Sequence, residues 1–347
     1  MILFLFLLAL QTPRVGSAAY LEAKEKAVAA HPDDVAAREE AVRAYWDYGQ
    51  NSGMPVAQVI AARRKHIAWL VEHHPEATVL GDMRGTITPD GSYLPDPAGY
   101  AEIARLWKQK VASAGAPTLA IVQAAHFFRL TDRTTAFAIS DRVWPSQQND
   151  PEVARLRATL DILEMMGATH WPNPADIVGD TAAFDSPKGR QARQELKQST
   201  NIAFLLSAGE TVLQFAHVSF MPTGAGPDMW KEAEQWLAHA HQLDPKNNTV
   251  SDQLAGIISR QAMFEPNKQE RVKLQRRALE LSASDEKKPP MLWALANYEL
   301  EAGNKEAAER DARQLLALAE RGVPGGAPSM DKFLADQARK IIEKASK

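Results

Sequence analysis

Amphipathic helical periodicity, broken at short intervals by proline, glycine and aspartate, is the feature that most restricts how this chain can fold. One helix is expected to begin after Asp33 and to end at Gly49, and the next is expected to begin at Pro55 and to end before Pro75. Such short helices cannot bury their apolar faces alone and must stack on their neighbours. The pattern therefore predicts a solenoid of antiparallel helix pairs, with about 14 to 16 helices in all. A turn signal at residues 89–91 is the one place where the sequence favours strands, as a small hairpin.

A repeated spacing of small residues follows Pro227. Ala233 and Ala240 stand on one expected helix, which is followed by Pro245. Small residues let two helices approach closely and a proline ends the unit, as in the second half of a known helical repeat pattern. Four alanines are expected to be buried where paired helices touch: Ala233, Ala240, Ala296 and Ala308. Ala319 lies outside the pattern and is expected to tolerate a larger side chain.

These positions, found in consecutive units with a consistent phase, resemble the tetratricopeptide repeat (TPR) family. The resemblance is good over residues 228–322. It is degenerate over residues 33–220, where the units exceed the usual length of about 34 residues. It implies an all-α fold, a right-handed α-solenoid of antiparallel, TPR-like helix pairs.

The chain is expected to divide into four parts. Residues 1–19 form a signal peptide, residues 20–170 form N-terminal degenerate TPR-like repeats, residues 171–189 form a linker or loop, and residues 190–347 form C-terminal TPR-like repeats. The N-terminal repeats contain a second long loop at residues 76–96. Loops of this length are either functional or connecting. Each loop can be a binding lid or an insertion that covers a helix end, and the second interpretation is favoured.

An apolar run at residues 1–10 is too short for a transmembrane helix, which needs about 20 residues. It fits the core of a signal peptide, and the small residues at 16–19 suit cleavage near Ala18 or Ala19. No Lys or Arg precedes the run, so a buried first helix stays an alternative. The protein is therefore expected to be exported, to the periplasm or outside the cell, with no integral membrane association after cleavage.

The composition argues against several classes of site. The sequence has no cysteine, which excludes disulfides, thiolate catalysis and cysteine-ligated zinc. Its formal net charge is -3, whereas nucleic-acid binding usually needs a basic surface. Phosphate-binding motifs are absent as well. We therefore expect no nucleic acid, no cofactor and no metal.

The histidines and serines do not form a catalytic motif. His66 and His73 can share one helix face, but no third ligand stands at a matching spacing, and each histidine is expected as a cap or a surface residue. Ser284 and Ser329 fit S-x-x-K without the accompanying K-T-G, and helix capping accounts for them. The sequence therefore predicts a protein that is not an enzyme. The alternatives are a helical enzyme with an unrecognised site and a small-molecule binding protein.

The resemblance implies that the first helix of each pair lines a concave face that binds a protein or peptide. Carried onto the matching positions, it implies these partner-binding residues: Arg43, Trp46, Phe128, Arg129, Asp252, Arg260, Trp293, Asn297 and Glu301. Arginines at equivalent positions in three units would favour a partner with acidic residues. The alternative is that these arginines pair with acids of neighbouring repeats and only stabilise the surface. A non-catalytic scaffold for protein interactions in the cell envelope is thus the expected function.

Overall fold

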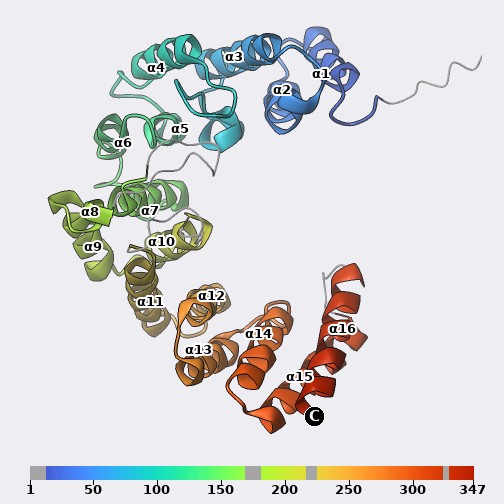
Figure 1. The fold of residues 1–347 in the computed structure, drawn as a ribbon. Coiled ribbons are helices and arrows are strands. Elements are labelled where there is room, and N and C mark those ends of the chain that lie inside the picture. The colour runs from blue at the N-terminus through green and yellow to red at the C-terminus, as the bar shows by residue number, and fades with distance from the viewer. Residues whose placement is uncertain (1–12, 169–180, 216–224, 323–327) are drawn as a thin grey trace, which may run out of the picture. The chain divides into compact units, whose positions relative to one another are not determined.

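Helices are the regular secondary structure of the part that the computed structural model describes, which is residues 13–168, 181–215, 225–322 and 328–347. These residues form sixteen α-helices, three short 3-10 helices and no strand (Figure 1). The predictions of an all-α fold and of about 14 to 16 helices are confirmed. The predicted hairpin around residues 89–91 is wrong. Those residues lie in a loop that is closed by a hydrogen bond from the amide of Asp96 to the carbonyl of Thr88, at 2.8 Å.

Two compact units make up the chain, and in the described residues unit 1 runs to Ser146 and unit 2 begins at Gln147. The helices of unit 1 are α1 (Ala18–Ala30), α2 (Val35–Tyr48), η1 (Gly49–Asn51), α3 (Val56–His73), η2 (Thr78–Gly81), η3 (Met83–Gly85), α4 (Pro97–Lys110), α5 (Thr118–Phe128) and α6 (Arg133–Ser140). The helices of unit 2 are α7 (Pro151–Met166), α8 (Thr181–Phe184), α9 (Pro187–Gln198), α10 (Ile202–Phe215), α11 (Ala225–Leu243), α12 (Asn248–Phe264), α13 (Lys268–Leu281), α14 (Lys288–Glu301), α15 (Lys305–Arg321) and α16 (Pro328–Ala345).

Helix α7 bears on the predicted domain organisation. It packs against α9 and α10, so it belongs with unit 2 although it precedes the linker predicted at residues 171–189. Most of that predicted linker, residues 171–180, lies outside the described residues. Its remaining part, residues 181–189, carries α8 and the start of α9.

Capping residues set the helix starts in unit 1. The carboxylate of Asp34, rather than that of Asp33, caps α2 by accepting a hydrogen bond from the amide of Ala37, at 3.1 Å. Pro55 directly precedes α3, and the carboxylate of Asp132 caps α6. At α2 and α6 the side-chain acceptor satisfies amides that the start of a helix leaves unpaired. The predicted starts of α2 and α3 are therefore confirmed, with the cap of α2 shifted by one residue.

Buried alanines mark the helix contacts of unit 2. The four alanines of the prediction are all 0% exposed: Ala233, Ala240, Ala296 and Ala308. Ala296 of α14 and Ala308 of α15 share one apolar cluster with Ile341 of α16. Small side chains let the helix axes approach here, as the spacing predicts.

Ala319 corrects an expectation. It is only 5% exposed, and it packs in a cluster with Leu334 and Ala338 of α16. The repeat pattern ends before α16, so it does not reveal that this last helix covers the end of α15. A larger side chain at Ala319 is therefore expected to overpack this cluster rather than to be tolerated.

The signal peptide at the N-terminus stays a prediction. Residues 1–10, the apolar core of that peptide, lie outside the described residues. The described part begins shortly before α1, where Ser17 caps the helix by accepting a hydrogen bond from the amide of Tyr20, at 3.2 Å. Among the described helices, none has the length and apolar character that crossing a membrane requires.

Candidate functional site

Three of the predicted partner-binding residues in unit 1 are buried. The exposed fractions are 9% for Trp46, 1% for Phe128 and 7% for Arg129. Side chains this deeply buried are not available to a partner, so the expectation that they lie on an open face is corrected. For Trp46 and Arg129 the cause is the loop at residues 76–96, in which η2 and η3 pack against α2, α3 and α5.

Trp46 is held by side chains from the loop and from α3. Its ring centroid lies 4.6 Å from that of Tyr93, whose hydroxyl donates to the carbonyl of Trp46. The guanidinium of Arg63 lies over the same ring, at 4.9 Å.

Phe128 packs within unit 1 as well, and its ring meets that of Phe127 edge-on at 5.0 Å. These aromatic rings belong to the core of unit 1.

Arg43 and Arg129 both contact the 76–96 loop. Arg129 donates to the carbonyl of Gly81 at 3.3 Å, and burial lowers the pKa of its guanidinium to about 10. Arg43 pairs with Glu39 at 3.2 Å and donates to the hydroxyl of Thr78 at 3.3 Å. The expected row of arginines that grip a partner is therefore not formed in unit 1, because these guanidinium groups bind the chain itself.

Asp252 also binds the chain itself. Its carboxylate accepts hydrogen bonds from the amides of Ala283 and Ser284, at 2.8 and 3.0 Å, and from the hydroxyls of Ser282 and Ser284. Partial burial disfavours the charged form, but these hydrogen bonds outweigh it and lower the pKa of the carboxyl group. Asp252 therefore stabilises the turn between α13 and α14. The same bonds account for Ser284, which had been expected to cap a helix.

The remaining predicted residues of unit 2 keep part of their surface exposed. Trp293 of α14 meets Phe333 of α16 at a ring distance of 6.1 Å, and Asn297 donates to the carbonyl of Trp293 at 2.8 Å. Glu301 pairs with Arg271 of α13 at 2.9 Å, and its side chain is 51% exposed. Arg260 is half-buried, and its Nη1 donates to the sulfur of Met263, one turn further along α12, at 3.8 Å.

A buried polar cluster in unit 1 was missed in the sequence. His66 of α3 is 0% exposed, and its Nε2 lies 2.7 Å from a carboxylate oxygen of Glu25 in α1. The hydroxyl of Tyr45 donates to the same oxygen at 2.9 Å, and Arg38 lies 3.5 Å from the other ring nitrogen. His66 is thus neither a cap nor a surface residue. Its partners lie on two other helices, so spacing within α3 could not reveal them.

The pKa values of Glu25, Tyr45 and Arg38 are shifted in this cluster. The hydrogen bond from His66, helped by that from Tyr45, lowers the pKa of Glu25 against the opposing effect of burial. Burial and the carboxylate of Glu25 raise the pKa of Tyr45. Burial lowers the pKa of Arg38. These pKa shifts follow from the packing among α1, α2 and α3.

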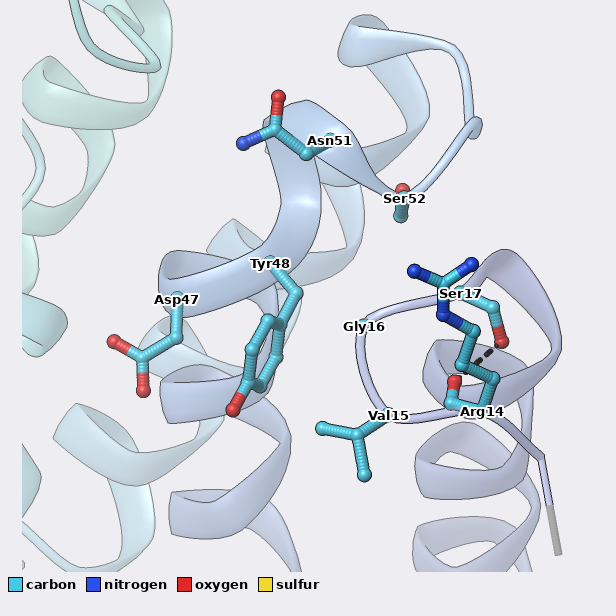
Figure 2. A pocket seen from close by; sticks show the side chains of 8 residues that line it. All are labelled: Arg14, Val15, Gly16, Ser17, Asp47, Tyr48, Asn51 and Ser52. Atoms are coloured by element: carbon cyan, nitrogen blue, oxygen red, sulfur yellow. Dashed lines mark hydrogen bonds between the residues drawn. The ribbon is translucent and has the colours of Figure 1, made fainter.

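A hollow of about 360 Å³ lies at the end of α2 (Figure 2). One wall is the N-terminal segment and the other is the end of α2 with η1, and the lining residues are Arg14, Val15, Gly16, Ser17, Asp47, Tyr48, Asn51 and Ser52. Ser17 donates its hydroxyl to the carbonyl of Arg14 at 2.7 Å, and Asp47 pairs with Arg84 at 3.1 Å. The lining contains no histidine, and its carboxylate, that of Asp47, is engaged by Arg84. In the described part of the chain, no three metal-ligating side chains come together either.

Comparison with known proteins assigns the chain to no family. No protein-family model matches the chain, and no curated protein matches it. Among solved structures, the crystal structure of the TPR domain of P58(IPK) matches 95% of this chain and 94% of that chain, at 11% identity and a TM-score of 0.26. A TM-score this low carries no argument about the fold or about a site. The TPR-like arrangement rests on the helix pairs and buried alanines described above.

Proposed function

We propose that this protein is a non-catalytic scaffold that binds a protein or peptide through one face of unit 2. We call it the α12–α14 face, and it comprises Arg260, Trp293, Asn297 and Glu301. Figure 1 shows α12 and α14 along one side of unit 2, with α11, α13 and α15 along the other. In a repeat array, the helices that lie along one side present a surface to a partner.

The observation that carries the proposal is the partial exposure of Trp293 and Asn297. The two residues lie one turn apart on α14 and are both half-buried, so each keeps part of its surface exposed. Aromatic and arginine side chains are the types that contribute most to binding at protein interfaces. Arg260 adds a cation to the face, which favours a partner with acidic residues.

A site-specific cross-linking experiment tests the proposal. A photo-crosslinking residue replaces Asn297 in one variant and Lys273 in a second, and each variant is expressed in the native host. Lys273 of α13 is the matched control, because its side chain is 73% exposed and α13 lies on the other side of unit 2. A protein cross-linked from position 297 and not from position 273 supports the proposal. Equal products from both positions, or none from 297, contradict it.

We also propose that the protein is exported after cleavage near Ala18 or Ala19. The support is the apolar run at residues 1–10 and the small residues that follow it. Such cleavage also removes Ser17, and the loss of a serine cap costs about 1 kcal/mol of helix stability. N-terminal sequencing of protein from its native host decides the point. Recovery of intact Met1 from the cytoplasm contradicts export.

A further inference from the structure

The segment at residues 77–96 fills one face of unit 1. Its 3-10 helices contact α2, α3 and α5, and Figure 1 shows it running beside these helices. Val79, Leu80 and Ile87 of this segment are 0, 2 and 1% exposed. The segment therefore contributes apolar side chains to a surface that three helices build.

Two buried arginines hold the backbone of the segment. Nε of Arg63 in α3 donates to the carbonyl of Arg84 at 3.1 Å, and its Nη2 donates to the carbonyl of Thr86 at 2.5 Å. Arg129, at the end of α5, donates to the carbonyl of Gly81 at 3.3 Å. Arg63 and Arg129 are 3 and 7% exposed, and their guanidinium groups donate to carbonyls in the described contacts. A buried cation needs such partners, so without the segment these arginines would face solvent.

Helix α2 binds the backbone of the segment as well. A carboxylate oxygen of Glu39 accepts hydrogen bonds from the amide of Val79 at 3.1 Å and from the hydroxyl of Thr78 at 3.0 Å. Gly81 approaches α5 closely, since a β-carbon there would lie 2.0 Å from the amide oxygen of Gln123. Contacts to backbone amides and carbonyls, together with pockets for apolar side chains, are a recurring way in which proteins bind peptide segments.

We propose that the face formed by α2, α3 and α5 is a peptide-binding groove whose occupant is the chain's own 77–96 segment. The groove selects a segment with two short 3-10 turns through its carbonyl oxygens, and it takes two apolar side chains in succession. While the segment is in place, Trp46 and Arg129 are covered, and unit 1 is closed to a separate partner. This inference does not depend on the α12–α14 face, because it can be tested without any partner protein.

A peptide supplied in trans is the first test. In the full chain, Val79→Asp combined with Leu80→Asp places two carboxylates where the segment is buried, which expels it from the groove. The probe is a fluorescent synthetic peptide of residues 76–96, and a scrambled peptide of the same composition is the control. Fluorescence anisotropy is expected to show binding to the double variant that is at least about tenfold tighter than to the unaltered chain. A double variant that stays helical by circular dichroism and does not bind the peptide overturns the proposal.

Hydrogen exchange of the unaltered protein decides the matter if the double variant does not fold. The amides of residues 79–88 are expected to exchange through a local opening, at denaturant concentrations where those of α2, α3 and α5 are still protected. Exchange of the segment only together with these three helices overturns the proposal. It would show that the segment is a permanent part of the core of unit 1.

Discussion

The carboxylate of Asp252 in α12 accepts hydrogen bonds from both the amide and the hydroxyl of Ser284, which lies between α13 and α14. This contact ties the first helix of one pair to the turn that leads into the next pair. The repeat pattern assigns position 252 to partner binding, whereas the structure shows a residue that joins two pairs. Side chains that link neighbouring units are expected to matter for stability in a repeat protein, because each unit is stabilised mainly by its neighbours.

Asp252→Ala is expected to lower the free energy of unfolding by about 2 kcal/mol. Hydrogen bonds to a charged group contribute about 1.5–3 kcal/mol, and the partial exposure of Asp252 keeps the total near the lower end. Urea denaturation at neutral pH measures the change. The control is Asp285→Ala in the same turn, where the carboxylate is exposed and the denaturation midpoint is expected to stay unchanged. Equal midpoints for the two variants would show that Asp252 does not join the helix pairs.

Ala308→Leu is expected to destabilise the protein by about 1–3 kcal/mol, because the extra atoms force α14 and α15 apart. Ala317→Leu is the matched control on α15, since Ala317 is exposed and Ala319 is not. Thermal unfolding of both variants gives the comparison. If both variants melt together with the unaltered protein, the buried alanines do not set the packing of the pairs.

Charge reversal is expected to affect stability differently at Arg129 and Arg260, which the repeat pattern treats as equivalent. Arg129→Glu places a carboxylate against the carbonyls of Gly81 and His126, and it should destabilise unit 1 by about 3–5 kcal/mol, the range for an uncompensated buried charge. Arg260→Glu changes a half-buried side chain and should leave the melting temperature nearly unchanged. Circular dichroism melting curves make the measurement. A stable Arg129→Glu variant would contradict the structural role of Arg129.

Glu25→Gln is expected to reduce stability in a pH-dependent way. The pKa of Glu25 is lower in the folded protein, so its contribution is present above the unfolded value of about 4.3 and is lost as the pH falls through the folded value. The variant should therefore be less stable than the unaltered protein by about 1–2 kcal/mol at neutral pH, with a difference that shrinks toward pH 3. Urea midpoints across this range test it. Glu22→Gln, an exposed change on the same helix, should show no such pH dependence.

Local signals in the sequence were sufficient to locate several helices and one contact between helices. Caps and prolines located α2 and α3, and the spacing of Ala296 and Ala308 located the contact between α14 and α15. These features act over a few residues of chain, so a sequence pattern carries them.

The candidate site was harder to predict because it depends on contacts between distant parts of the chain. Trp46 and Arg129 have the residue types of a binding surface, but the loop at residues 76–96 covers them. The environment of His66 depends in the same way on Glu25, which lies 41 positions earlier. No spacing within a single helix encodes such contacts, so burial of these side chains could not be deduced from periodicity.

The affinity of the partner for altered forms of the α12–α14 face tests the central claim most directly. The protein cross-linked from position 297 supplies the ligand, and isothermal titration calorimetry compares the unaltered chain with the double variant Arg260→Glu, Asn297→Ala. The account predicts an affinity at least about tenfold weaker, or about 1.4 kcal/mol, with an unchanged melting temperature. An unchanged affinity in a folded double variant would contradict binding through the α12–α14 face.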